Sequence, residues 1–321
     1  MKLHARFAAM MLSPALLAAG PEIVSAQNYP HKPIRIVTTA VGGSTDLVAR
    51  TIAQGLTGNL GQQVIVENRG GGVIAGEIVS KASPDGYTLL YFGNSLWITP
   101  LLRKNMPYDV VGDFAPITLA ISLSQILVLH PSVAAKSVKE LIAVAKAKPG
   151  ALNYASGPGA GTNVLAAELF KAMAGIDIVR IPFKGEGPAV TALLGGDVQM
   201  QFASAGSVAP HLKFGRLRAL AVTSAKPSVL FPDMPTMSAS LPGYEATQTS
   251  GMFAPAKTPL AVIRRLNQES VRVLNEPEVK QKILGWGAEP VANSPEELAA
   301  IIRSDRAKFS KLFRDAGIRE E

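Results

Sequence analysis

The sequence has no cysteine among its 321 residues. That absence excludes a thiolate nucleophile, a zinc site with cysteine ligands, a disulfide framework and a lipid-modified N-terminal cysteine. The fold must therefore be stabilised by its hydrophobic core, for which 47% apolar residues are available. A chain of this length can bury enough apolar surface for two lobes of ordinary domain size.

Histidine is scarce, and the local motifs of common hydrolases are missing. The sequence contains neither Gly-x-Ser-x-Gly nor Ser-x-x-Lys. None of the histidines stands at metal-ligand or triad spacing from a carboxylate; they are His4, His31, His130 and His211. We therefore expect a protein that is not an enzyme, with no catalytic residues, no metal site and no cofactor. An exported α/β hydrolase with catalytic groups drawn from distant parts of the chain is the alternative.

Beyond the N-terminal segment, no hydrophobic run is long enough to span a membrane. The N-terminal segment has the pattern of a secretory signal, with basic Lys2 and Arg6, an apolar run over residues 7–19, and small residues at Val24-Ser25-Ala26. We expect export, with cleavage after Ala26. An uncleaved membrane anchor is the alternative, and the prolines within the segment argue against it.

Charge is mildly positive and dispersed. The formal net charge is +8, the lysines and arginines are scattered, and only 6% of residues are aromatic. A nucleic-acid-binding face instead gathers basic residues on one surface, often interleaved with aromatics, so we expect no nucleic-acid partner. A weak positive field favours small anions.

Six segments repeat one local pattern, in which a short apolar strand leads through a turn of glycine and small residues into an amphipathic stretch. In the first, residues 34–37 precede Gly42-Gly43, Ser44 or Thr45 is suited to cap a helix, and Asp46 lies in its first turn. The other turns lie at residues 70–72, 93–95, 156–162, 184–187 and 203–206. Strands alternating with helices predict an α/β fold with mostly parallel sheets.

Proline-rich stretches indicate where the chain passes between lobes, near His130-Pro131 and over residues 225–250. We expect a signal peptide at 1–26, a first lobe of 27–129 plus 250–321, a second lobe of 130–225, and a Pro-rich return segment at 226–249. Two crossings would make a hinged cleft, at which turns from the carboxyl ends of the strands meet. A single doubly wound sheet with a helical tail is the alternative.

The turns are suited to bind anions, because a helix N-terminus exposes unpaired N–H groups and a partial positive charge. Opposed turns could hold a carboxylate, whereas glycines that serve only tight packing are the alternative. The Gly-Lys-Ser/Thr ending of a phosphate-binding loop is missing. Residues 157–161 approach a dinucleotide fingerprint with the third glycine one position early, and Asp177 could bind a ribose, so a Rossmann-like site stays open.

Short motifs along the whole chain after residue 28 resemble one family, the Bug-type solute receptors of tripartite tricarboxylate transporters. Individually none is specific, but together and in this order they are. They are Tyr29-Pro30-x-x-Pro33, Gly42-Gly43-x-x-Asp46, Val66-Glu67-Asn68-Arg69, Pro84-Asp85-Gly86-Tyr87-Thr88-Leu89, Pro107-Tyr108-Asp109, Asp113-Phe114-Ala115-Pro116, Phe183-Lys184-Gly185, residues 217–222 and Leu241-Pro242-Gly243-Tyr244.

The resemblance implies a monomeric periplasmic receptor with a two-lobed, flytrap-like type II binding-protein fold. It would bind a small organic carboxylate in the interlobe cleft and pass it to membrane permease subunits; a partner role in sensing would look the same. The implied ligand-binding residues are Thr39, Ala40, Gly42, Gly43, Ser44, Asn94, Ser95, Ser156, Gly157, Thr162 and Asn163, with Lys184 and Ser204 as weaker candidates.

Some positions depart from the family pattern. Residues 38–41 read Thr-Thr-Ala-Val where the family usually has Pro-Phe-Ala-Pro, and Phe202-Ala203-Ser204 replaces the common Phe-Asp-Asn. Two further side chains carry open hypotheses. Glu186 could bind a cationic group of the ligand or be solvated, and Trp97 could stack on an aromatic acid or belong to the core.

Overall fold

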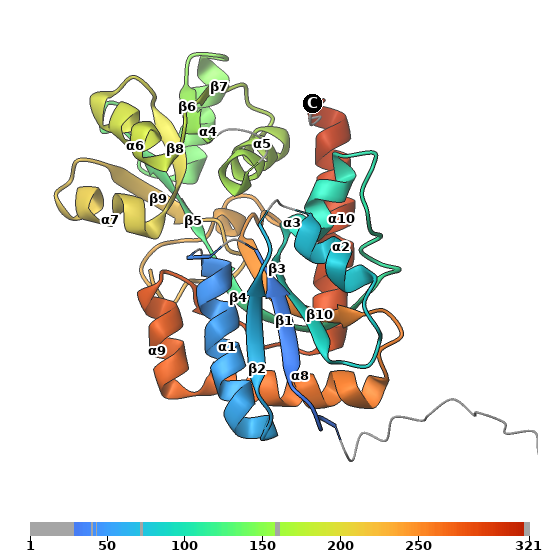
Figure 1. The fold of residues 1–321 in the computed structure, drawn as a ribbon. Helices are drawn as coiled ribbons and strands as arrows, with labels where there is room; N and C mark the ends of the chain where they lie inside the picture. The colour runs from blue at the N-terminus through green and yellow to red at the C-terminus, as the bar shows by residue number, and fades with distance from the viewer. Residues whose placement is uncertain (1–28, 40, 43, 71–72, 158–160, 318–321) are drawn as a thin grey trace, which may run out of the picture.

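The computed structural model describes residues 29–317 except 40, 43, 71–72 and 158–160. Within these residues the chain forms two α/β lobes, each built on its own sheet (Figure 1). The two-lobed fold predicted from the sequence is confirmed. The predicted signal segment lies outside the described residues.

Lobe 1 has a six-stranded sheet with the order β11-β4-β10-β3-β1-β2. β1 runs parallel to both β2 and β3, whereas β10 runs antiparallel to β3 and β4. The strands are β1 (Ile34–Thr38), β2 (Val64–Asn68), β3 (Thr88–Gly93), β4 (Phe114–Leu123), β10 (Gln248–Pro255) and β11 (Glu289–Pro290).

Helices cover both faces of this sheet, because its strands are apolar on both sides. Apolar residues of α1, α8 and α9 share one buried cluster with β1, and those of α2, α3 and α10 share another with β3. The helices are α1 (Ser44–Leu60), α2 (Ile74–Ser80), α3 (Ser95–Ile98), the 3₁₀ turn η2 (Thr99–Leu101), α8 (Leu260–Asn275), α9 (Pro277–Gly285) and α10 (Pro295–Ala316). α10 begins with a capping box of Ser294 and Glu297, which the Ser-x-x-Glu spacing in the sequence indicates.

Lobe 2 has a five-stranded sheet with the order β7-β6-β8-β5-β9. Here α4 and α5 pack on one face, and α6 and α7 on the other. The elements are β5 (Gln125–Leu129), α4 (Val138–Ala147), β6 (Asn153–Ser156), α5 (Thr162–Ala174), β7 (Val179–Pro182), α6 (Glu186–Gly195), β8 (Met200–Ser204), α7 (Ala205–Lys213) and β9 (Arg218–Val222).

Both sheets are mixed, which corrects the expectation of mostly parallel sheets. Among the described strands, only β1 with its neighbours and β6 with its neighbours pair in parallel. The first crossing joins β4 to β5, and the second joins β9 to β10. In lobe 1 β4 pairs antiparallel with β10, and in lobe 2 β5 pairs antiparallel with β8 and β9. An apolar run predicts a strand but carries no information on its direction, so the sequence pattern could not show this.

The chain passes between the lobes at Ser124, and again over residues 223–247, which contain the 3₁₀ turn η3 (Met237–Ala239). β5 therefore begins directly after β4 and pairs with β8 and β9. The sequence-based division had placed residues 125–129 in the first lobe. Because only Ser124 separates β4 from β5 and neither Gly nor Pro stands at this point, no turn signal marks the passage between lobes.

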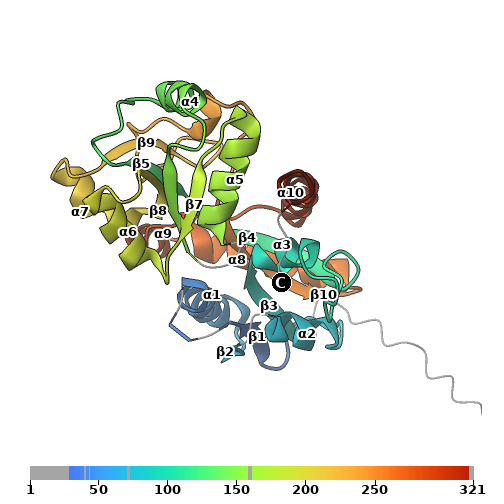
Figure 2. The ribbon, with the colours of Figure 1, turned by 90° about the horizontal axis from the view of Figure 1, so that it is seen from above.

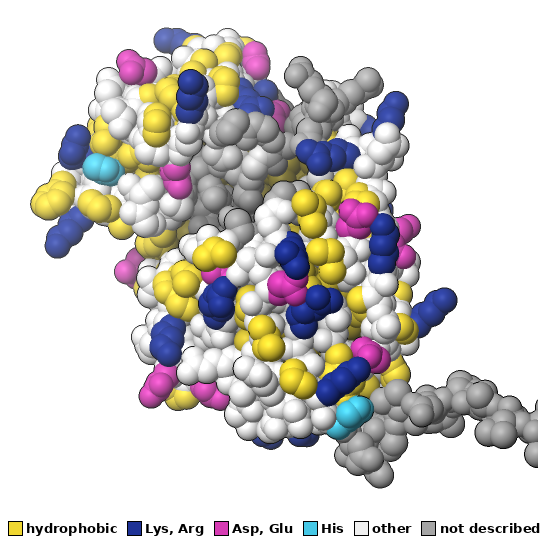
Figure 3. Space-filling view, in the orientation of Figure 1, with side chains coloured by type: hydrophobic (Ala, Val, Ile, Leu, Met, Phe, Trp, Pro, Cys, Tyr) yellow, Lys and Arg dark blue, Asp and Glu magenta, His cyan; other side chains and the backbone are white. Residues whose placement is uncertain are grey.

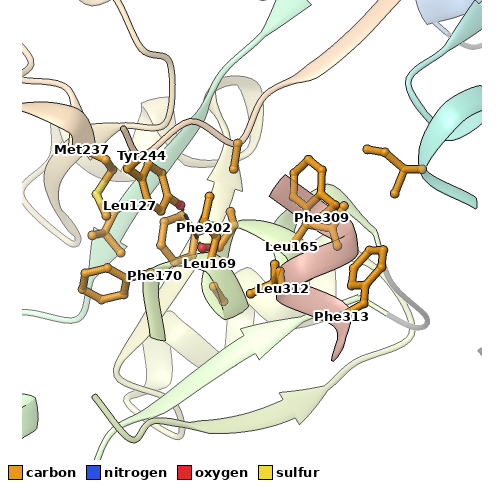
Figure 4. Packing of buried hydrophobic residues seen from close by; sticks show 14 of the residues in the cluster. Leu127, Leu165, Leu169, Phe170, Phe202, Met237, Tyr244, Phe309, Leu312 and Phe313 are labelled. Carbon is orange, nitrogen blue, oxygen red and sulfur yellow. Dashed lines mark hydrogen bonds between the residues drawn. The ribbon is translucent and has the colours of Figure 1, made fainter. Parts of the chain in front are cut away.

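The C-terminal helix α10 also contacts lobe 2. Phe309, Leu312 and Phe313 of α10 share a buried cluster with Leu165 and Leu169 of α5 (Figure 4). α10 and α5 lie side by side both in the side view and from above (Figures 1 and 2). This apolar seam positions the first turn of α5 relative to lobe 1.

Candidate functional site

A cavity of about 400 Å³ lies between the lobes. Lobe 1 contributes the ends of β1 and β3 and the starts of α1 and α3, and lobe 2 contributes the start of α5. The polar residues of its walls are Thr39, Thr45, Asn94, Ser95, Thr99, Thr162 and Gln248, and Gly161, which precedes α5, also lines it. No described wall residue carries a charge.

Four of the sequence-predicted ligand residues meet at this cavity: Thr39, Asn94, Ser95 and Thr162. Ala40 and Gly43 lie outside the described residues, as does the side chain of Ser44. The remaining predicted residues are not part of the described cavity wall; they are Gly42, Ser156, Gly157, Asn163, Lys184 and Ser204. Their binding roles stay predictions.

In the first turn of lobe 1, a side chain of the protein already uses the amide of Gly42. Asp46 is only 2% exposed, and its Oδ2 accepts a hydrogen bond from the Gly42 N–H at 3.0 Å. Its Oδ1 accepts from Asn68 Nδ2 at 2.8 Å and pairs with Arg50 Nε at 3.0 Å. Burial alone would raise the pKa of Asp46, but the bonds from Gly42, Asn68 and Arg50 outweigh it and lower the pKa. An ionised carboxylate therefore stabilises the conformation of this turn.

Asn94, in the cavity wall that follows β3, is hydrogen-bonded to the segment by which the chain returns from lobe 2 to β10. Its backbone N–H donates to Thr249 O at 2.8 Å, and its Nδ2 donates to Thr247 O at 3.0 Å. These bonds fix Asn94 at the end of β3 and leave the following Ser95 exposed at the cavity. Ser95 is thus the freer of the two polar residues to meet a ligand.

Arg180, which was not predicted from the sequence, stabilises the lobe 2 turn after β6. Arg180 of β7 donates from Nε to Ser156 Oγ at 2.8 Å and from Nη2 to Gly157 O at 3.0 Å. Ser156 Oγ in turn donates to Gly157 O at 3.1 Å. The Ser156 hydroxyl therefore both donates and accepts within the protein. Arg180 stands in mid-strand without a local motif, so no sequence signal marked it.

The start of α5 differs from the start of α1. Its N-cap is Gly161, no side chain caps it, and its first turn contains no acidic residue. Within the turn, Asn163 Oδ1 accepts a hydrogen bond from the Val164 N–H at 2.9 Å. The helix start still places its positive dipole end at the cavity wall, where Gly161 and Thr162 lie.

Glu186, which follows Lys184 in the turn after β7, stabilises the next lobe 2 turn at Ser204. Glu186 Oε1 accepts from the Ser204 N–H at 2.6 Å and from Ser207 Oγ at 2.8 Å, and its Oε2 accepts from Ser204 Oγ at 3.0 Å. Glu186 thus caps the start of α7. Glu186 is exposed, as the solvated alternative expects, and its carboxylate is also occupied by these bonds within the protein. Lys184 is exposed.

Trp97 belongs to the core. Its side chain is fully buried, its ring lies 6.2 Å from that of Phe253, and Nε1 donates to Asp305 Oδ2 at 3.1 Å. An indole so placed cannot stack on a ligand without leaving the core, which excludes the stacking hypothesis for this conformation.

Three features would point to other functions: a metal site, a membrane-spanning helix and a patch of basic residues. Among them, no group of three His, Asp or Glu side chains is placed to hold a metal ion. No helix within the described ranges is both long and apolar enough to traverse a bilayer. Lys and Arg side chains are scattered over the face shown in Figure 3 rather than gathered in one patch.

The family model for the tripartite tricarboxylate transporter family receptor matches residues 48–318. The chain belongs to this receptor family. It is 36% identical to the protein BugT of Bordetella pertussis over 300 residues, which cover 92% of each chain. Family membership makes it a solute-binding receptor of a transporter rather than an enzyme, and confirms the predicted resemblance.

Solved structures of relatives share the fold. The R. palustris protein Rpa4515, solved with adipate, is 31% identical with a TM-score of 0.70, covering 91% of this chain and 99% of that one. MatC of Rhodopseudomonas palustris, solved with malate, is 27% identical with a TM-score of 0.65, covering 88% and 99%. Both of these relatives bind small carboxylates.

Proposed function

We propose that this receptor binds a small organic carboxylate in the 400 Å³ cavity between its lobes and delivers it to the permease subunits of its transporter. The observation that carries the proposal is the wall of this cavity, where polar groups of both lobes, among them Thr162 at the start of α5, face one space. The adipate and malate bound by two relatives are of a size and class suited to such a cavity.

We further propose that Thr39, Asn94, Ser95 and Thr162 contact the ligand directly, because they come from both lobes and line the cavity. Gly42, Ser156 and Ser204 would act indirectly, since their amide or hydroxyl groups already bond within the protein. A division into lobes with crossings at Ser124 and over residues 223–247, export with cleavage after Ala26, and a monomeric state complete the proposal.

A thermal-shift panel tests this function. The mature chain is heated with adipate, malate, citrate, benzoate or glutamate, each against the corresponding neutral amide. A ligand at a hundred times its dissociation constant adds about 2.7 kcal/mol of stability, which raises the melting temperature measurably. We expect at least one acid to do so and to be recovered chemically unchanged in stoichiometric amount. No response across the panel would contradict the proposal, and turnover of the acid would favour the hydrolase instead.

A further inference from the structure

A second cavity, of about 490 Å³, lies beside the two crossings between the lobes, and we call it the hinge cavity. Its walls come from both crossing segments and from β4, β10, β11 and α10 of lobe 1. Successive side chains of a strand point to opposite faces. Where β10 begins, Gln248 lines the cavity proposed for the carboxylate, whereas Thr247 and Thr249 line the hinge cavity. The two cavities are therefore separate sites on opposite faces of this segment.

The hinge cavity has charged residues in its wall, unlike the carboxylate cavity. They are Lys226, Glu245, Glu289 and Asp305. Both ammonium groups at this place have acidic neighbours. Lys308 pairs with Asp305 at 3.1 Å. Hydrogen bonds at Ser294 lower the pKa of Glu297, and the Lys226 ammonium adds to that effect. Four carboxylates against two ammonium groups leave a net charge of −2 at the hinge cavity.

Glu245 and Glu289 are the two wall carboxylates without a cationic partner among the described residues. Glu289 accepts from Ser228 Oγ and, at 3.5 Å, from the Val229 N–H, which are both uncharged donors. The Glu245 carboxylate makes no hydrogen bond or ion pair within the described part of the chain, since Lys308 Nζ donates to the Glu245 backbone O instead, at 2.9 Å. A cation is therefore attracted to this cavity.

Two buried hydroxyl groups of the same wall have no hydrogen-bond partner, Thr249 Oγ1 and Ser224 Oγ. Thr249 is only 6% exposed, and a buried polar group is seldom left without a partner. An N–H group of a ligand in the hinge cavity would supply the missing donor. The wall also contains Leu119, Val291 and Ile301, which are suited to contact an alkyl chain.

An organic cation fits this cavity better than a metal ion. A metal ion needs several ligands close together, and within the described ranges no three His, Asp or Glu side chains are so placed. We propose that the hinge cavity binds a small alkyl amine. Its ammonium groups would lie at Glu245 and Glu289, with an N–H donated to Thr249 Oγ1. The site is distinct from the carboxylate cavity and does not depend on the proposed function.

Calorimetric titration with three four-carbon compounds of nearly equal length tests the charge requirement. They are 1,4-diaminobutane, 4-aminobutan-1-ol and 1,4-butanediol, which carry two, one and no positive charges at neutral pH. We expect affinity to rise with charge, with the diamine bound one-to-one and at least tenfold more tightly than the diol, and the difference to shrink as salt is added. Equal affinity for all three compounds, or no binding of the diamine, would overturn the proposal.

Two variants test the residues of the site. Glu245→Gln removes an exposed carboxylate that makes no bond within the described structure, and it should weaken the diamine at least fivefold. Thr249→Val loses no internal bond, because the hydroxyl has no partner, and it should weaken both amines at least threefold. The matched control is Glu278→Gln, an exposed carboxylate of α9 outside this wall, for which we expect unchanged affinity. Equal losses in Glu245→Gln and Glu278→Gln would contradict the site.

Thr162→Trp, which places an indole in the wall of the carboxylate cavity, separates the two proposals. We expect this variant to bind the diamine with a Kd within twofold of the wild type. Loss of diamine binding in Thr162→Trp would place the amine in the carboxylate cavity and overturn the hinge site. If the diamine binds as expected but no carboxylate binds the wild type, only the proposed function fails.

Discussion

The indole N–H of Trp97 donates a hydrogen bond to the carboxylate of Asp305 over 3.1 Å and ties α3 to α10. Asp305 is also paired with Lys308 at 3.1 Å. Because Ser95 of α3 lines the cavity while α10 packs on α5, this bond lies on the structural path between the two walls of the site.

Asp305→Ala is expected to destabilise the protein by about 1–3 kcal/mol, because it leaves the buried indole N–H without its acceptor. Asp305→Asn retains an acceptor and should cost less. Urea unfolding measures both. Asp315→Ala serves as the control, since Asp315 is an exposed α10 residue paired with Lys311, and its loss should stay within about 0.5 kcal/mol. Equal losses at both positions would show that the Trp97 bond contributes nothing.

The lowered pKa of Asp46 predicts how stability depends on pH. A carboxylate whose folded pKa is lowered stabilises the fold above its unfolded pKa of about 3.9, and this stabilisation is lost as pH falls through the folded pKa. Asp46→Asn should therefore cost roughly 1–3 kcal/mol at neutral pH. The difference from wild type should shrink below about pH 4.

Chemical unfolding at a series of pH values measures this difference. Asp233→Asn is the matched control, because Asp233 is exposed and makes no hydrogen bond or ion pair within the described part of the chain. A wild-type advantage over Asp46→Asn that is constant from neutral pH down to pH 2 would show that the Asp46 carboxylate is not the source.

Glu186→Ala is expected to loosen the start of α7, because three donors lose their acceptor. The expected loss of stability is about 0.5–2 kcal/mol, as for a helix N-cap. Amide hydrogen exchange should accelerate in α7 and not in α10. Affinities for an amino acid and for a plain dicarboxylate should change by the same factor. A selective loss of affinity for the amino acid would instead indicate that Glu186 contacts the ligand.

The sequence predicted what local patterns encode. The turn after β1, the capping box at Ser294 and the two-lobed fold follow from glycine spacing, capping chemistry and the family motifs. The pairing of β5 with lobe 2 and the seam between α10 and α5 depend on contacts between distant segments, so no local pattern indicates them. Arg180 was missed for the same reason. Its guanidinium reaches a turn 23 and 24 residues earlier in the chain.

The central claim is that a carboxylate binds in the cavity between the lobes, and filling that cavity tests it most directly. Calorimetric titration compares the best acid of the panel in the wild type, in Thr162→Trp, which places an indole in the cavity wall, and in Thr191→Trp, which places one on the exposed face of α6. We predict one-to-one binding to the wild type and to Thr191→Trp. Thr162→Trp should weaken binding by at least about 1.4 kcal/mol, or tenfold. The same affinity in all three proteins would contradict the account.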